Sequence, residues 1–150
     1  YDLQPEMSAP EIADKVVSAI NENCYETIIV NFANPDMVGH TGNLKAAIKA
    51  IESVDKCLYK IRKIVRAKNG TIFLTADHGN LEMMKDPNTG QIHTAHTTLP
   101  VPLIIDSSRI DFKLMDSGKL ADIAPTILDY YKIKKPKEMS GNSLLIFDNA

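Results

Sequence analysis

The chain has 150 residues, of which 44% are hydrophobic, which is enough for one sizeable buried core and too apolar for a disordered segment. Its 17 basic and 19 acidic residues are scattered and leave a formal net charge of −2, with one mild basic cluster at Lys132, Lys134, Lys135 and Lys137. This balance argues against nucleic acid or an anionic membrane surface as a partner.

Cysteine usage and hydropathy point to a cytoplasmic protein. Cys24 and Cys57 are too few for a disulfide framework, and both are predicted to be reduced thiols in the core. The sequence shows no signal peptide and no apolar run of membrane-spanning length. Because it begins at Tyr1 without an initiator methionine, we expect it to be part of a longer protein.

The first third of the chain predicts a helix and then a strand. Ser8 to Glu11 has the pattern of a capping box, and the apolar residues from Ile12 to Ile20 recur at helical spacing, which predicts a helix of about a dozen residues. Residues 25–34 (YETIIVNFAN) contain a continuous β-branched and aromatic run. Such a run is typical of a strand covered on both faces.

The remaining elements alternate between helix and strand. One long amphipathic helix is predicted from Gly42 to about Lys68, with a left-handed cap at 68–70. A second strand (71–76), a turn-rich loop (85–90) and a third strand (101–106) follow. The last helix is predicted from Asp122, as its capping residue, to about Tyr131, before an irregular tail.

This alternation predicts an α/β layered domain with a mostly parallel sheet flanked by helices. The first strand, the long helix and the second strand would form one right-handed crossover. Parallel strands place their carboxyl ends at the same edge of the sheet, where α/β domains bind their ligands.

Polar side chains follow the predicted strands at that edge. Asp36 and His40 follow the first strand, Asp77 and His78 follow the second, and His93 and His96 precede the third; these segments hold all four histidines of the chain. Aspartate and histidine without clustered cysteines suit Mn²⁺ or Zn²⁺. The three segments together predict a metal site.

Each motif also has a simpler interpretation. Asp36 could cap a helix with His40 in solvent, Asp77 and His78 could belong to a turn, and His93 could be a surface residue. Neighbouring residues of an extended backbone point to opposite sides, so geometry alone favours Asp77 and His78 facing two different metals.

The sequence resembles the C-terminal part of the cofactor-independent (2,3-bisphosphoglycerate-independent) phosphoglycerate mutases, which belong to the alkaline phosphatase superfamily. The segments that carry the resemblance run in family order from end to end: YDLQPEMSAPEIADKVV, NFANPDMVGHTG, TADHGN, HTAHTTLPVPLI and LADIAPTILDYY with PKEMSGNSL. The resemblance implies an alkaline-phosphatase-like α/β fold, with residues 1–150 forming the C-terminal portion of a single metal-binding domain.

The resemblance also implies a set of metal ligands. Asp36, His40 and His96 would bind one Mn²⁺, and Asp77 with His78 would join a second; Zn²⁺ or another divalent ion could replace manganese. His93 would then be a neighbour of the ligands. This assignment overrides the expectation that Asp77 and His78 face different ions, and it requires no 2,3-bisphosphoglycerate.

In the family, the implied activity is the glycolytic interconversion of 3-phosphoglycerate and 2-phosphoglycerate through a phosphoserine. The serine nucleophile, a further aspartate of the second metal site and the phosphate-binding residues would precede Tyr1, so we expect the chain alone to be inactive. The full-length protein would be a cytoplasmic monomer that binds a small-molecule phosphoglycerate. Exposed sheet edges would favour self-association of the chain alone.

Two alternatives remain open from the sequence. Another enzyme of the same superfamily, such as a phosphopentomutase or a metal-dependent phosphatase, would share the ligand pattern. The chain could also be a non-catalytic metal-binding or interaction domain.

Overall fold

Residues 1–109 and 111–147 are described in the structure, a computed structural model. The chain forms two compact units, Tyr1–Ser107 and Ser108–Ala150. Each unit contains both helices and strands, which confirms the α/β class. The single-domain organisation expected from the sequence stays a prediction.

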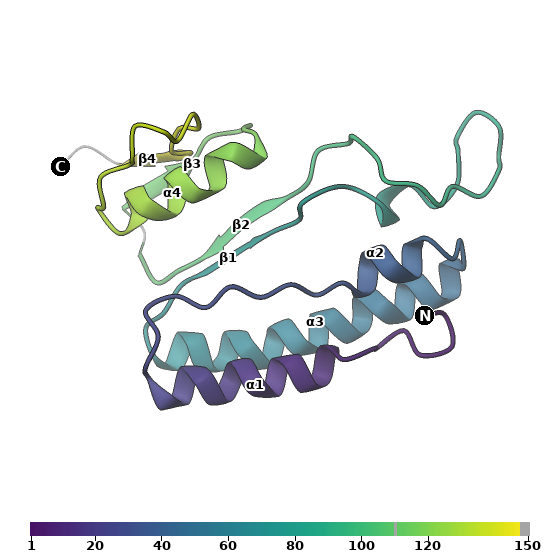
Figure 1. Cartoon of the computed structure of the whole chain (residues 1–150), viewed down its shortest axis with the longest axis horizontal. Helices are drawn as coiled ribbons and strands as arrows, with labels where there is room; N and C mark the ends of the chain where they lie inside the picture. Colours follow the sequence, from purple (N-terminus) through teal and green to yellow (C-terminus); the bar gives the residue numbers. More distant parts are fainter. Residues whose placement is uncertain (110, 148–150) are drawn as a thin grey trace. The chain divides into compact units, whose positions relative to one another are not determined.

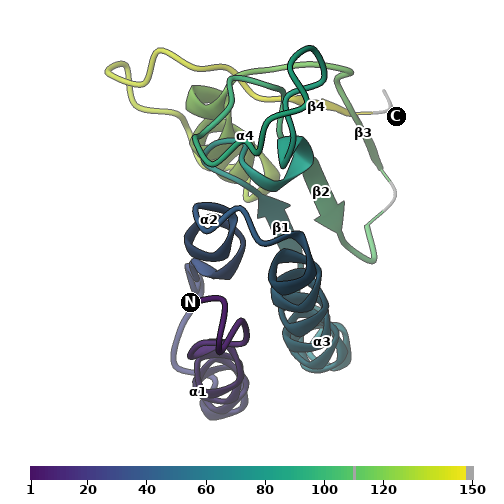
Figure 2. The ribbon, with the colours of Figure 1, turned by 90° about the vertical axis from the view of Figure 1, so that its right-hand side faces the viewer.

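The first unit is built on two packed helices, α1 (Ala9–Glu22) and α3 (Leu44–Ala67) (Figures 1 and 2). Their contact is formed by five buried residues, namely Ala9, Ala13, Val16, Cys57 and Ile61. Apolar residues three and four apart on each helix form one stripe, and burial of this stripe stabilises both helices. The long helix predicted from the sequence is confirmed, as is its left-handed end at Asn69, with φ +55°.

Three local predictions in this unit were wrong. Ser8 precedes α1 but makes no capping hydrogen bond, since its backbone (φ −96°, ψ 14°) is not the extended one from which a side chain caps. Cys24 is exposed because it lies in the connection after α1, whereas Cys57 is buried as expected. Residues 27–32 do not form a strand: in the described part of the chain, no backbone hydrogen bond reaches them.

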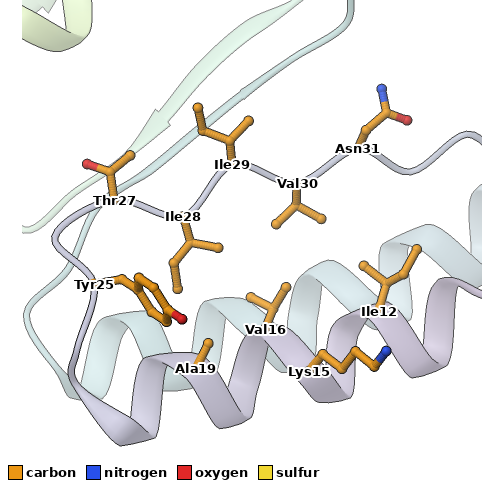
Figure 3. Close-up of a pocket in the computed structure, with 10 residues that line it drawn as sticks. All are labelled: Ile12, Lys15, Val16, Ala19, Tyr25, Thr27, Ile28, Ile29, Val30 and Asn31. Atoms are coloured by element: carbon orange, nitrogen blue, oxygen red, sulfur yellow. The ribbon is translucent and has the colours of Figure 1, made fainter.

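Residues 27–32 nevertheless keep the alternation of a strand. Ile28 and Val30 point toward α1 and pack against its core, whereas Ile29 points away and is 94% exposed (Figure 3). A groove of about 490 Å³ runs between this segment and α1. The segment is therefore covered on one face in the described residues, and the expectation of two covered faces was wrong.

The two strands of this unit pair in the opposite sense to the one predicted. β1 (Ile72–Thr75) and β2 (Leu103–Asp106) are antiparallel, with Ile72 opposite Asp106 and Thr75 opposite Leu103. A parallel pair needs a crossover, usually a helix, but residues 76–102 form an irregular loop with one short 3-10 helix, η1 (Leu81–Met83). The chain therefore turns back along β1 (Figure 1).

A short helix carries Asp36 and ends at His40. α2 (Asn34–Gly39) follows the extended segment directly and packs on α3. The contact is close because the facing positions of α3 are small: Val38 packs on Ala46, Ala47 and Ala50. The side chain of Asn43 accepts a hydrogen bond from the backbone amide of Ala46 at 3.2 Å and so caps the start of α3, with four residues between the end of α2 and the start of α3.

The second unit contains β3 (Phe112–Leu114), η2 (Leu120–Asp122), α4 (Ile123–Tyr130) and β4 (Leu145–Phe147), with β3 and β4 antiparallel. Asp122 precedes α4 but does not cap it, contrary to the prediction. Its buried carboxylate instead accepts hydrogen bonds from the amides of Lys119 and Asn142. These bonds lower the pKa of Asp122 to about 2. Among the described residues, no helix has both the length and the apolar character needed to cross a bilayer.

Candidate metal centre

Asp36 and His40 come to one face of α2 because they are four residues apart. This spacing brings side chains one helical turn apart into contact. Asp36 lies in the first turn of α2, and His40 is the residue that ends the helix. The distance between Asp36 Oδ1 and His40 Nε2 is 3.1 Å.

His96 reaches the same point from the loop between β1 and β2. Its Nε2 lies 2.9 Å from Asp36 Oδ1 and 3.1 Å from His40 Nε2. Three atoms, Asp36 Oδ1, His40 Nε2 and His96 Nε2, therefore form a nearly equilateral triangle. The side chains of Asp36, His40 and His96 are 31%, 41% and 48% exposed, so the triangle is open to solvent.

The protonation of His40 follows from its other ring nitrogen. His40 Nδ1 lies 2.6 Å from the carbonyl oxygen of Thr94. Because a carbonyl only accepts hydrogen bonds, Nδ1 carries a proton, and the neutral form of the ring would present the lone pair of Nε2 to the triangle. Metal-binding histidines are held in this way in many proteins.

The triangle fits a divalent metal ion, for two reasons. Bonds of about 2.1 Å from one ion to two atoms at right angles place those atoms roughly 3.0 Å apart, which matches the observed distances. The three atoms are also a carboxylate oxygen and two imidazole nitrogens, each of which can offer a lone pair to an ion when its ring nitrogen is deprotonated. Carboxylate and imidazole ligands suit Mn²⁺ and Zn²⁺.

Asp77 and His78 lie beside the triangle. The rings of His78 and His96 are stacked, with centroids 3.7 Å apart, and His78 Nε2 lies 3.9 Å from Asp36 Oδ1. His78 Nε2 is also 3.7 Å from Asp77 Oδ1, so these neighbours do not point to opposite sides. The expectation drawn from an extended backbone was wrong, because β1 ends at Thr75 and residues 77 and 78 lie in a bend.

Asp36 is held as an anion. Burial opposes its ionisation, but the hydrogen bond from Asn80 and the neighbouring imidazoles outweigh burial and lower the pKa of Asp36 below its usual range. Asn80 Nδ2 donates to Asp36 Oδ1 at 2.9 Å. A carboxylate that stays charged near neutral pH is ready to bind a cation without first losing a proton.

Two further side chains join the loops that carry the histidines. Glu82 accepts hydrogen bonds from the Asn80 amide, at 2.7 Å, and from the Thr97 hydroxyl. The Thr97 amide in turn donates to the carbonyl of Gly79 at 2.9 Å. These bonds fix residues 77–80 against the segment that ends in His96.

His93 does not take part in the triangle. Its amide donates to the Met84 carbonyl at 3.0 Å, and its Nδ1 is buried without a hydrogen-bond partner in the described residues. Sequence reasoning did not single out Asn80, Glu82 or Thr94. Asn80 follows directly after Asp77 and His78 in the TADHGN motif, which was a usable signal. The contribution of Thr94 is a backbone carbonyl, which has no residue signature.

Residues 1–135, which include Asp36, His40, Asp77, His78 and His96, match the family described as the Metalloenzyme superfamily. The chain belongs to this superfamily. A family defined by metal-dependent enzymes agrees with the donor set of the triangle and indicates a divalent metal.

Curated relatives extend the comparison. The 2,3-bisphosphoglycerate-independent phosphoglycerate mutase of Enterobacter sp. (strain 638) is 52% identical over 148 residues, 99% of this chain and 29% of the relative. The enzyme of that name from Yersinia pestis (strain Pestoides F) is 51% identical, with 28% of its length covered. The chain thus spans under a third of these relatives, and the resemblance predicted from its motifs is confirmed.

A solved structure shows the same fold. Leishmania mexicana phosphoglycerate mutase, crystallised at low cobalt concentration, superposes with a TM-score of 0.89 and 30% sequence identity. The match covers 99% of this chain and 30% of the Leishmania chain. This similarity confirms the alkaline-phosphatase-like α/β class, although the strand pairs among the described residues are antiparallel.

Proposed function

We propose that this chain is the metal-binding portion of a cofactor-independent phosphoglycerate mutase, an enzyme that interconverts 3-phosphoglycerate and 2-phosphoglycerate. The observation that carries the proposal is the triangle of Asp36 Oδ1, His40 Nε2 and His96 Nε2, with sides of 2.9 to 3.1 Å. The names and the sequence identity of the curated relatives support the reaction.

In this proposal the chain supplies ligands to two divalent ions. Asp36, His40 and His96 hold one ion, and Asp77 with His78 contribute to the second. Mn²⁺ is the proposed metal, with Zn²⁺ as the other candidate for the same donor set. The stacked rings of His78 and His96 support two adjacent sites, since they place the two ligand sets side by side.

The residues of the chain prepare the site for phosphoryl chemistry. Bound divalent ions would lower the pKa of an attacking hydroxyl and offset the charge of the transferred phosphoryl group. Thr94 keeps the proton of His40 on Nδ1, and Asn80 helps to keep Asp36 ionised. The ligand atoms therefore need little reorganisation before an ion binds.

We also propose that the chain alone does not turn over phosphoglycerate. Within residues 1–109 and 111–147, no serine is hydrogen-bonded to Asp36, His40, His78 or His96. The nucleophile would then come from another part of a longer protein. An assay that couples 2-phosphoglycerate formation to enolase should show no turnover, and turnover that co-purifies with the chain would contradict this.

Metal uptake by the purified chain tests the proposed site. Calorimetry with Mn²⁺ should show binding to the wild type and none to the double variant His40→Ala, His96→Ala. His93→Ala is the matched control, because this histidine lies in the same loop as His96 but outside the triangle. Equal uptake by the double variant and the wild type would overturn the ligand assignment.

A further inference from the structure

Asn80 is a buried polar residue beside the proposed metal ligands. Only 6% of it is exposed, and its Nδ2 lies 2.9 Å from Asp36 Oδ1 and 3.4 Å from the Asp36 carbonyl oxygen. The nitrogen of the amide has to face Asp36, because two oxygens at this distance would repel each other. Asp36 Oδ1 is the same atom that faces the two histidines.

The other end of the Asn80 amide has no partner. Asn80 Oδ1 is buried without a hydrogen bond in the described residues, and it lies against the Cα of Gly39, where a Cβ would collide with it. Burying a polar oxygen unpaired is unfavourable. Stability alone would favour an apolar side chain of similar shape at this position. The side-chain amide of Asn80 therefore indicates a role other than stabilising the fold.

The backbone of Asn80 is fixed independently of its side chain. The backbone N–H of Asn80 donates to Glu82 Oε2 at 2.7 Å, and Glu82 also accepts a hydrogen bond from the Thr97 hydroxyl. Asn80 thus stands on a loop that is tied to the segment carrying His96, and its side chain reaches across to α2. It links the two segments that supply the triangle, which are α2 with its end at His40 and the loop that carries His96.

We propose that Asn80 is a positioning residue of the metal centre, which holds Asp36 Oδ1 toward His40 Nε2 and His96 Nε2 and so raises the affinity of the three ligands for a divalent ion. The inference rests on the proposed metal site. Gly39 belongs to the same device, because only a residue without a Cβ leaves room for the Asn80 amide at this angle.

Four proteins test the inference: the wild type, Asn80→Leu, Asp36→Asn and Asn43→Ala. Leucine has the shape of asparagine but donates no hydrogen bond, and Asn80→Ala replaces it should the leucine variant not fold. Asn43→Ala is the matched control, since it removes another asparagine hydrogen bond, the cap of α3, without touching Asp36. Circular dichroism establishes that each variant is folded at the temperature of the titration.

Mn²⁺ affinity is measured by calorimetry, and the environment of bound Mn²⁺ by its electron paramagnetic resonance spectrum. Loss of a residue that orients a metal ligand typically weakens binding by about 10- to 100-fold, and we expect this for Asn80→Leu, with an altered spectrum of the bound ion. Asn43→Ala should keep the wild-type affinity and spectrum even where its thermal stability falls as far as that of Asn80→Leu.

The outcomes separate this inference from the proposed site. If Asp36→Asn loses binding but Asn80→Leu binds Mn²⁺ like the wild type, the positioning role is overturned and the site stands. If Asp36→Asn binds like the wild type, or the wild type binds no Mn²⁺, the proposed site fails and the inference fails with it. Equal losses in Asn80→Leu and Asn43→Ala would show a general effect of stability and would also overturn the role.

Discussion

Two aspartates of this protein, Asp36 and Asp122, have lowered pKa values and opposite surroundings. Asp122 in the second unit is 4% exposed and accepts hydrogen bonds from the amides of Lys119 and Asn142, both at 2.9 Å, and from the Lys119 ammonium at 3.0 Å. Asp36 in the first unit has one amide donor, Asn80, and otherwise faces imidazole nitrogens.

The difference shows how a structural carboxylate is distinguished from a ligand. Donors that surround an anion satisfy it, as at Asp122, and the arrangement needs nothing further. Possible metal ligands converge on Asp36 instead, because Nε2 of His40 and Nε2 of His96 lie 3.1 and 2.9 Å from its Oδ1, and a cation can bind among the three atoms. A lowered pKa is common to both cases, so the identity of the neighbouring atoms decides the function.

Exchanging each carboxylate for its amide gives the largest contrast between the two regions. Asp36→Asn should weaken Mn²⁺ binding by at least about 100-fold, because a neutral amide is a poor ligand for this ion, and should change the thermal stability of the metal-free chain little. Asp122→Asn should do the reverse, with wild-type affinity and an unfolding midpoint lowered by several degrees, since its NH₂ group would face other donors. Calorimetry and thermal unfolding check both, and a metal-binding defect in Asp122→Asn would abolish the distinction.

Much of the candidate site could be predicted from residue spacing. Asp36 and His40 are four apart, and TADHGN follows a strand, so local rules were enough to group these side chains. His96 required the resemblance to a family, because the loop of residues 76–102 that brings it back to Asp36 has no regular pattern. The tautomer of His40 depends on the carbonyl of Thr94, which any residue type could have supplied.

The sheet was less predictable for a related reason. The parallel arrangement was inferred from alternating helices and strands, but the segment between β1 and β2 contains no long helical pattern, and this already favoured an antiparallel return. Residues 27–32 have the composition of a buried strand without backbone partners among the described residues. Composition records the burial of Ile28 and Val30, whereas hydrogen-bond partners depend on distant segments.

Substitution of two glycines should separate metal binding from stability in the same way as the two aspartate variants, with smaller effects. A Cβ at Gly39 would collide with the Asn80 side chain, so Gly39→Ala should displace this amide from Asp36 and weaken Mn²⁺ binding about 10-fold. A Cβ at Gly141 would collide with the backbone carbonyl of Ala121, so Gly141→Ala should lower the unfolding midpoint and leave metal binding unchanged. Wild-type stability in Gly141→Ala would contradict the packing around Asp122.

The two regions should also respond to pH in different ranges. The pKa of Asp122 is about 2 in the folded chain, against roughly 3.9 when unfolded, so its stabilising effect is complete above about pH 4 and is lost as the pH falls toward 2. Mn²⁺ should dissociate at a higher pH than this, because protons compete with the ion for the imidazole nitrogens. The unfolding midpoints of the metal-free wild type and of Asp122→Asn should therefore converge near pH 2. A difference between the two midpoints that stays constant from pH 6 to 2 would contradict the stabilising role of ionised Asp122.

A third carboxylate should show almost no effect. Asp14 forms an ion pair with Lys60, and both side chains are more than half exposed. Solvent and salt screen such pairs, so Lys60→Ala should change the free energy of unfolding by at most about 0.5 kcal/mol and leave Mn²⁺ affinity unchanged. Urea unfolding at low and high salt measures this change. A loss of stability in Lys60→Ala as large as that in Asp122→Asn would show that the exposure of an ion pair does not predict how much it stabilises this chain.

The most direct test of the proposed metal site is a crystal structure of the chain, from crystals grown with Mn²⁺, with anomalous diffraction recorded at the manganese absorption edge. We expect an anomalous peak within about 2.0–2.3 Å of Asp36 Oδ1, His40 Nε2 and His96 Nε2. A map without a peak there, or with manganese bound only at other side chains, would contradict it.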